Sequence, residues 1–296
     1  MKPLMASLTW PFRHLPIPWS LFLLISTVLA IGFGLAFVNL QESQGVLRTW
    51  EEESQLHLVE RMARETDQIF DHYSQGVQNF SAATANALQL TGIEGAFRFF
   101  LAQQTLQKTL RDNPQYAVIA ITDGLGRTLA DRSSSNLDPL QFDDYFALGR
   151  KAGFQGQRYV SPLILMEGFS FPFVVFSEPV TDAGGTHVAV VCVVIQLEAL
   201  VNQIVSTVPK WHRVFLCDDQ GRLIATTAGS ENSEPALGQP GDDFTFHPLV
   251  QRFMQNGRRW NELVAYDRAD LTYLGTFSVT RTLPWMVASE VPERIA

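Results

Sequence analysis

The sequence has few basic residues and few cysteines for its length. The 296-residue chain carries 22 lysines and arginines against 30 aspartates and glutamates, a formal net charge of −8. Nucleic-acid binding needs a basic surface that neutralises phosphates, so this balance excludes nucleic acid as the main partner. Cys192 and Cys217 each lie inside an apolar run, which favours buried thiols over the disulfide framework of small secreted domains. A single Cys192–Cys217 bridge is the alternative.

The sequence also lacks the common signatures of catalysis and metal binding. The six histidines are scattered, without the spacing of H-x₃-H, HExxH or Cys-His ligand sets, so we predict no metal and no cofactor. No phosphate-binding loop is present, and the run Gly168-Phe-Ser170-Phe-Pro172 lacks the second glycine of a nucleophile elbow. We therefore predict that the chain is not an enzyme, and an exported hydrolase is the least favoured function.

A long apolar run lies near the N-terminus. Residues 19–38 (WSLFLLISTVLAIGFGLAFV) contain no charge and match the length of a helix that crosses about 30 Å of hydrocarbon. Lys2 and Arg13 precede the run, whereas Glu42 and residues 51–53, all glutamate, follow it. The positive-inside rule then places residues 1–18 in the cytoplasm and everything after about residue 40 outside. We therefore expect a protein of the inner membrane whose bulk is extracytoplasmic, in the periplasm. A cleavable signal peptide is the alternative, but its apolar region is usually about 7–15 residues long.

A long amphipathic helix is predicted after this run. No proline lies between Pro18 and Pro114, and apolar residues recur mostly every three, four or seven positions. This pattern predicts a stalk helix over residues 39–90, a break at Thr91-Gly92, and a second helix that ends before Pro114. The apolar stripe is a plausible homodimer seam and consists of Leu47, Trp50, Leu58, Met62, Ile69, Tyr73, Val77, Phe80, Ala83, Ala87 and Leu90.

From residue 116 onward the sequence pattern predicts short β-strands, and one hairpin pattern occurs twice. Residues 117–130 (AVIAITDGLGRTLA) align without gaps on residues 212–225 (HRVFLCDDQGRLIA), so that Asp123 matches Asp218. Each copy is an apolar strand, an aspartate, a glycine turn and a strand that begins with arginine. Neither copy has the alternating oxygen ligands of a calcium loop, so we expect both aspartates to stabilise their turns.

Further elements follow from composition and turn signals. We expect a short helix over residues 144–151, a strand over 158–165, a strand pair over 171–180 and 187–197, a helix over 197–205, and two closing strands over 271–280 and 284–291. The fold class is therefore α+β, with an N-terminal transmembrane helix, a long helix and two tandem modules with antiparallel sheets.

This arrangement resembles the double Cache extracytoplasmic sensor domain of bacterial receptors, which consists of two PAS-like modules. The resemblance covers nearly the whole chain and is carried by the two D-x-x-G-R hairpins, Asp144-Tyr145-Phe146, Ser161-Pro162, Ser177-Glu-Pro-Val180 with Asp182-Ala-Gly-Gly185, and the closing residues 283–290. It implies a membrane-distal module over residues 91–205 and a membrane-proximal module over residues 206–296. It also implies that the chain is the front section of a longer receptor, because the closing strand leads to a second span in such receptors.

In this family the distal module usually holds a small ligand. The amino-acid-binding branch uses an arginine two residues before an aromatic pair and an aspartate late in the last strand. Those positions are Asp143 and Val194 here, and the aromatic pair is Tyr145-Phe146. Both charged partners of an amino acid are thus missing, so we predict that the ligand is not a free α-amino acid.

The candidate ligand-binding residues have alternative structural roles. Tyr145 and Phe146 either line the pocket or pack the short helix on the sheet. Arg158, which precedes Tyr159, either holds an anion or is an exposed strand-edge arginine. The full predicted set is Asp143, Tyr145, Phe146, Arg158, Tyr159 and Ser177.

The sequence therefore predicts the input region of a membrane-anchored receptor. Its partners would be an unidentified small molecule, the membrane through residues 19–38, and a second copy of the chain. The alternative is an interaction module that binds a protein or a cell-wall component and has no small-molecule pocket.

Overall fold

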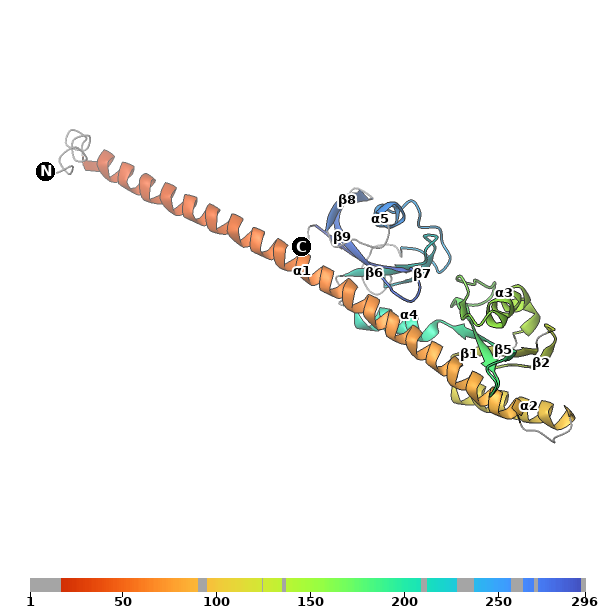
Figure 1. Cartoon of the computed structure of the whole chain (residues 1–296). Helices are drawn as coiled ribbons and strands as arrows, with labels where there is room; N and C mark the ends of the chain where they lie inside the picture. The colour runs from red at the N-terminus through yellow and green to blue at the C-terminus, as the bar shows by residue number, and fades with distance from the viewer. Residues whose placement is uncertain are drawn as a thin grey trace. The chain divides into compact units, whose positions relative to one another are not determined.

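The computed structural model describes residues 17–89, 95–123, 125–134, 137–208, 212–227, 237–256, 263–268 and 271–293. The chain divides into one unit of Met1–Ser54 with Ala296 and a second, larger unit of Gln55–Ile295. The second unit is an α+β fold with two five-stranded antiparallel sheets (Figure 1).

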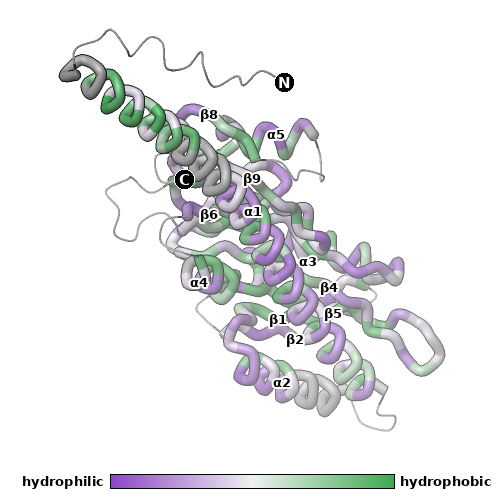
Figure 2. Tube along the Cα trace, turned by 90° about the vertical axis from the view of Figure 1, so that its left-hand side faces the viewer, coloured by the Kyte–Doolittle hydropathy of each residue, from purple (hydrophilic) through white to green (hydrophobic). Residues whose placement is uncertain are grey.

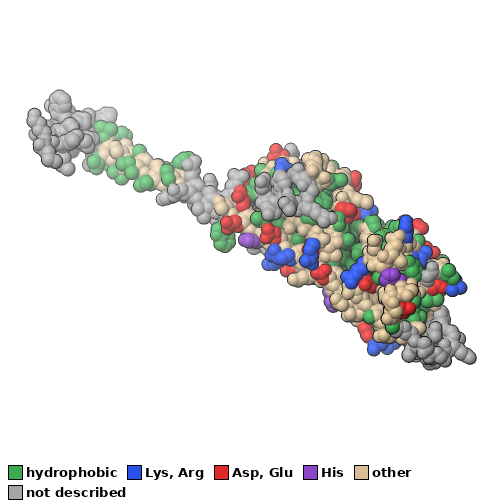
Figure 3. Space-filling model, in the orientation of Figure 1, with side chains coloured by type: hydrophobic (Ala, Val, Ile, Leu, Met, Phe, Trp, Pro, Cys, Tyr) green, Lys and Arg blue, Asp and Glu red, His purple; other side chains and the backbone are tan. Residues whose placement is uncertain are grey.

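Helix α1 (Ile17–Gln89) begins in the first unit. Its described side chains at positions 22–38 are apolar or uncharged and mostly exposed, and this stretch is largely hydrophobic in Figure 2 and uncharged in Figure 3. In the part of the chain that the structure describes, however, no helix is both long and apolar enough to span a membrane. The predicted span over residues 19–38 is therefore not confirmed.

The second part of α1 packs on the sheets of its own chain. Several members of the predicted dimer stripe are less than 9% exposed and share one hydrophobic core with strands of both sheets, namely Leu58, Met62, Tyr73, Val77 and Phe80. These side chains are covered within one chain, so they cannot form the seam that the sequence predicts. Trp50 is exposed and Ala83 lies on the exposed side of the helix. The side chains of Leu47 and Leu90 lie outside the described residues.

The first sheet has the strand order β2-β1-β5-β4-β3. The strands are β1 (Tyr116–Asp123), β2 (Thr128–Ser133), β3 (Tyr159–Val160), β4 (Phe173–Thr181) and β5 (His187–Gln196). α1 and α2 (Gly95–Asp112) contribute to the core on one face. The short helix η2 (Pro139–Phe142) and α3 (Asp143–Phe154) cover the other. Side chains alternate between these faces, since successive residues of a strand point in opposite directions.

The second sheet repeats this order as β7-β6-β10-β9-β8. Its strands are β6 (Arg213–Cys217), β7 (Leu223–Thr226), β8 (Val264–Arg268), β9 (Leu271–Val279) and β10 (Met286–Pro292). Helix α4 (Glu198–Thr207) leads from β5 toward this sheet, and α5 (Pro248–Asn256) covers the face that points away from α1.

The predicted role of the repeated aspartates is confirmed. One carboxylate oxygen of Asp123 accepts the backbone N–H groups of Leu125 and Arg127, both at 2.9 Å. Asp218 does the same for Gln220 and Arg222, at 3.0 and 2.8 Å. In each copy the second oxygen pairs with the guanidinium of the arginine four residues on, at 2.7 Å. The two hairpins are therefore one structural unit used twice.

Some expected elements differ in extent. The strand predicted over residues 158–165 is reduced to β3, followed by an isolated bridge between Ile164 and Phe173. Pro162 has no N–H group to donate to a ladder, which accounts for part of this shortening.

Helix α5 and strand β8 were not predicted, and the break at Thr91-Gly92 lies outside the described residues. Cys192 and Cys217 are both buried and unbridged.

Candidate ligand-binding site

Helix α3 lies very close to the first sheet. A Cβ atom at Gly149 would stand 2.0 Å from Ser177 Oγ, and one at Gly153 would stand 2.5 Å from a methyl group of Val190. Such distances are far shorter than a van der Waals contact, so only glycine permits this approach at the two positions. The two glycines are four residues apart and therefore face the sheet together.

Three polar side chains form a row across the sheet beneath α3. The strand register pairs Tyr159 with Ser177 and Ser177 with Cys192. Directly paired residues project to the same face of a sheet, which here is the face that α3 covers. Phe146 is 2% exposed and packs on this face, and the partly buried Tyr145 packs beside it. The structure thus brings four of the six predicted site residues together.

The hydroxyl group of Tyr159 is buried and has no hydrogen-bond partner among the described residues. Burial raises the pKa of this hydroxyl, and Tyr145 and Cys192 add to the increase. The group therefore remains a neutral O–H donor at physiological pH. Because an unsatisfied buried hydroxyl costs free energy, this donor marks a position where a ligand atom can supply the missing acceptor.

Ser177 and Cys192 form the centre of the row. The Ser177 hydroxyl donates to Cys192 Sγ at 3.2 Å, and both side chains are at most 2% exposed. Burial raises the pKa of the Cys192 thiol to about 11, although the Ser177 hydroxyl and the Arg150 charge oppose the rise. The thiol is therefore protonated, and it offers a weakly polar, uncharged surface rather than a nucleophile.

Arg158 lies on the opposite face of the sheet from this row. Its Nε atom donates to Glu178 at 3.2 Å, and Glu178 follows Ser177 directly and so points the other way. The carboxamide of Gln78 in α1 lies 2.7 and 3.0 Å from the terminal guanidinium nitrogens and accepts from both when its oxygen is turned toward them. Arg158 is thus neutralised beside α1 and does not join the other candidates.

Asp143 also stands apart from the polar row. It is exposed in the first turn of α3, where a negative charge interacts favourably with the helix dipole. The structure therefore places Asp143 and Arg158 apart from the other four candidates. Those four are Tyr145 and Phe146 of α3, Tyr159 of β3 and Ser177 of β4.

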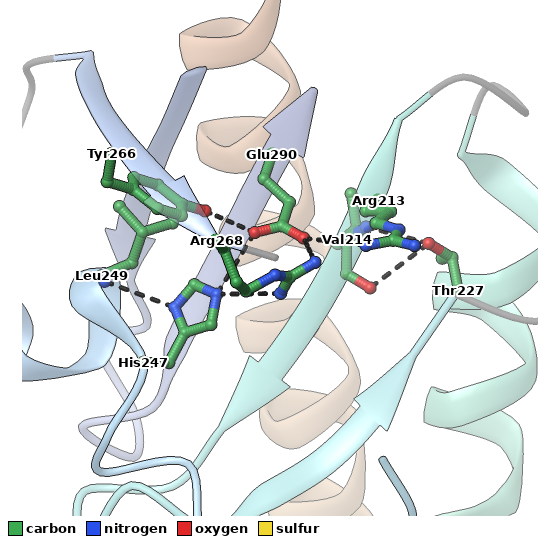
Figure 4. Close-up of polar contacts among 8 residues, drawn as sticks. All are labelled: Arg213, Val214, Thr227, His247, Leu249, Tyr266, Arg268 and Glu290. Carbon is green, nitrogen blue, oxygen red and sulfur yellow. Dashed lines mark hydrogen bonds and ion pairs between the residues drawn. The ribbon is translucent and has the colours of Figure 1, made fainter. Parts of the chain in front are cut away.

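A second buried polar cluster lies on the second sheet, and the sequence did not predict it (Figure 4). Glu290 of β10 is fully buried, and its Oε1 atom pairs with Arg268 at 2.8 Å and with Arg213 at 3.5 Å. Its Oε2 atom accepts from the Tyr266 hydroxyl and lies 3.2 Å from His247 Nε2. The available signal was a carboxylate in a strand that is apolar apart from Ser289, on the same side as Met286 and Ala288.

The cluster keeps Glu290 ionised. Burial works to raise the pKa of this carboxyl, but the hydrogen bond from His247 and the charge of Arg268 outweigh it, so the pKa lies below its ordinary value. Burial and the Glu290 charge raise the pKa of the Tyr266 hydroxyl. The carboxylate is thus the acceptor and the phenol the donor in their contact.

The fold is that of a tandem α+β domain, in which a long helix packs on two successive antiparallel sheets of identical strand order. The sequence profile of the Cache domain family matches residues 43–296, and the chain belongs to this family. The family consists of sensor domains of signalling receptors, which are not catalytic.

Solved sensory domains share the fold. The sensory domain of the Campylobacter jejuni chemoreceptor Tlp3 with isoleucine bound has a TM-score of 0.61 at 16% identity and covers 82% of this chain and 93% of its own. The extracellular domain of rpHK1S-Z16, described as a histidine kinase, has a TM-score of 0.59 at 16% identity, covering 83% and 96%. The ligand-binding domain of Mlp24 with asparagine has a TM-score of 0.57 at 15% identity, covering 83% and 95%. No curated protein sequence matches the chain significantly.

Proposed function

We propose that the chain is the extracytoplasmic input region of a signal-transduction receptor, and that it binds a small molecule between α3 and the first sheet. The observation that carries this proposal is the buried Tyr159 hydroxyl without a partner among the described residues. A ligand with a hydrogen-bond acceptor would satisfy that donor, while Tyr145 and Phe146 supply apolar area. The proposed ligand-binding module is the predicted one, residues 91–205.

We propose a ligand other than a free α-amino acid. Tlp3 and Mlp24 are solved with isoleucine and asparagine, but the low identity transfers only the fold. The row of Tyr159, Ser177 and Cys192 contains no charge, and Arg158 is paired with Glu178 on the other face. An ammonium group buried here would therefore lack an anionic partner that offsets its desolvation, and the Arg150 charge that acts on Cys192 would disfavour it further.

The segment after Tyr159 offers a route from this site to the second sheet. Four residues further on, the backbone carbonyl of Leu163 accepts from Arg222 at 3.3 Å, and Arg222 is the arginine of the second repeated hairpin. If β3 can occupy two slightly different positions, a ligand that binds more tightly to one of them would change the contact between Leu163 and Arg222. We propose that ligand binding biases the second sheet in this way, since a ligand shifts only what it binds differently in two states.

Helix α1 provides a second connection between the sheets. The Phe70 ring stacks on Phe176 of β4 with centroids 6.0 Å apart, and it meets Trp285, next to β10, edge-on at 4.9 Å. Asp67 accepts the backbone N–H groups of Arg281 and Thr282 at 2.8 to 3.0 Å. Displacement of β4 would thus be transmitted through α1 to the loop before β10.

We further propose attachment to the inner membrane through residues 19–38, with the second unit in the periplasm. The uncharged run and the charge difference across it support this proposal. Recovery of the full chain in the membrane fraction after alkaline washing is the expected result, and recovery in the soluble fraction would contradict it. Dimerisation would have to use α1 residues outside the buried stripe.

The test of ligand binding is thermal unfolding of the full chain with a panel of small metabolites that includes neutral compounds, organic acids and amino acids. A bound ligand raises the Tm by mass action. We expect a neutral or acceptor-rich compound to raise it, and Tyr159→Phe to reduce that increase. Tyr116→Phe is the matched control, because Tyr116 lies in the same sheet but in the core on the α1 face.

Three results would contradict the proposal. An increase with free amino acids alone would refute the ligand class. An equal loss in both tyrosine variants would refute the location. If no compound raised the Tm while a protein or cell-wall fragment did, the interaction-module alternative would replace the sensor for small molecules.

A further inference from the structure

The surroundings of Glu290 satisfy a carboxylate group completely (Figure 4). Each oxygen has two donors: Arg268 and Arg213 on one side, Tyr266 and His247 on the other. Two cationic guanidinium groups and two further donors around one fully buried carboxylate provide the charge-assisted hydrogen bonds that offset its desolvation.

The tautomer of His247 is determined by its surroundings. The backbone N–H of Leu249 donates to Nδ1 at 3.3 Å, so Nδ1 is the acceptor and Nε2 carries the proton. Nε2 lies 3.2 Å from Glu290 Oε2 and therefore donates to it. The Nη1 atom of Arg268, 3.3 Å from the same Nε2, can only donate, so that approach is a close contact and not a hydrogen bond. The start of α5 thus orients the imidazole as a donor toward the carboxylate position.

The arginines are also held by groups other than Glu290. The Arg268 guanidinium lies 4.7 Å from the centre of the Tyr273 ring, and that of Arg213 lies 5.9 Å from the same ring. Cation–π contacts of this kind orient a guanidinium plane. All four donors come from β6, β8 and the residues before α5, so none of them belongs to the strand that carries the carboxylate.

We infer that the second sheet contains a preformed binding site for one carboxylate group, which the chain fills with its own Glu290. Donors from three separate segments converge on the two oxygens of a single side chain, as they would on a bound organic acid. The site is therefore occupied internally, and its occupant ties the closing strand β10 to β6, to β8 and to the start of α5.

The inference is tested by replacing the internal occupant with an external one. Glu290→Ala removes the side chain beyond Cβ, a fragment that acetate reproduces. The full-length variant is purified at neutral pH in sodium chloride and in sodium acetate of equal ionic strength. In chloride we expect a Tm about 10 °C below the unsubstituted chain, since one partner of a buried ion pair is lost. Acetate at ten times its dissociation constant should then raise the variant's Tm by roughly 3–6 °C.

Two controls make the result specific. Glu178→Ala also removes a glutamate that is paired with an arginine, but this pair lies in the first sheet and its arginine, Arg158, is largely exposed to solvent. The Tm of this variant in acetate should not exceed its Tm in chloride. The double variant Glu290→Ala/Arg268→Ala should lose the response to acetate. If Glu290→Ala is insoluble in chloride, soluble yield is the readout, and acetate should restore it. If the Tm of Glu290→Ala, or its soluble yield, is the same in the two salts, the inference is overturned. It is also overturned if acetate raises the Tm of Glu178→Ala by the same amount.

Discussion

The two sheets have the same strand order, yet the faces that point away from α1 contain opposite chemistry. In the first sheet the central strand β5 contributes Cys192 to an uncharged row, and the neighbouring Tyr159 hydroxyl has no described partner. In the second sheet the central strand β10 contributes Glu290, whose oxygens have four donors. The same strand order thus supports two different faces. In the first sheet a hydrogen-bond donor is unsatisfied, and in the second sheet the buried carboxylate is satisfied by groups of the chain itself. We interpret the first as the sensing face and the second as an anchor for the closing strand.

The comparison predicts its largest effect for the two glutamates. Glu290→Gln should lower stability by about 3 kcal/mol, or roughly 10 °C in Tm, because it leaves buried guanidinium groups without their counter-charge. Glu178→Gln should cost less than about 1 kcal/mol, since its partner Arg158 is 59% exposed and the pair is screened by solvent. Thermal unfolding of both full-length variants measures the difference. Equal losses would mean that the buried partners of Glu290 stabilise the fold no more than the solvent-screened ion pair of Glu178 does.

The repeated hairpins give the next effect. Asp218 is 1% exposed and shares its arginine with the Leu163 carbonyl, whereas the Asp123 side chain is 14% exposed and its partner Arg127 is 71% exposed. Asp218→Ala should therefore cost about 2 kcal/mol, through lost hydrogen bonds to a charged group. Asp123→Ala should cost less. Chemical denaturation of the two variants ranks them, and the reverse order would show that burial does not distinguish the two copies.

A smaller effect is expected under α3. Gly149→Ala gains about 1 kcal/mol in helix propensity but loses about 1–3 kcal/mol by forcing the helix away from Ser177, a net loss of about 1 kcal/mol. The same displacement should abolish the increase in Tm that a ligand produces. Leu148→Ala, at an exposed position of the same helix, should leave the ligand response intact. A ligand response that survives Gly149→Ala would place the site elsewhere.

The smallest effect concerns pH. The pKa of Glu290 is lowered in the folded chain from an ordinary value of 4.5. Its stabilising contribution is therefore present above about pH 4.5 and is lost as the pH falls through the folded pKa. The charged and titratable groups that face it are Arg213, His247, Tyr266 and Arg268, with Tyr273 beside the arginines. The difference in Tm between the unsubstituted chain and Glu290→Gln should narrow only below about pH 4.5. Narrowing on the alkaline side instead would contradict this assignment.

Local patterns predicted much of the fold. The duplicated Asp-x-x-Gly-Arg turn, the strand pair around Asp182 and the two closing strands depend on contacts between residues close in sequence, and they formed as expected. Strand β8 and helix α5 are short and adjoin polar segments, so neither was predicted. The apolar residues of α5 do share one face, but the helix is only nine residues long, and both elements are stabilised by packing on the second sheet.

The candidate site could be predicted only in part. The sequence made Tyr145, Phe146, Tyr159 and Ser177 candidates through the resemblance to the Cache family, and the structure places these four residues on one face of the first sheet. It could not assign Arg158 to the α1 face, since its orientation depends on the register between β3 and β4. The same limit applies to the apolar stripe of α1, whose periodicity does not distinguish a partner chain from the chain's own sheets.

The sequence by itself determined most of the helices, strands and turns, and that one hairpin occurs twice, because these depend on period, turn residues and local hydrogen bonds. Only the tertiary structure decided which face each polar side chain occupies and which distant groups meet there. Glu290 meets donors from 22 to 77 residues away in the chain, and its burial is tolerated only because all of them converge on it. Such convergence is a property of strand order and register, which no local pattern specifies.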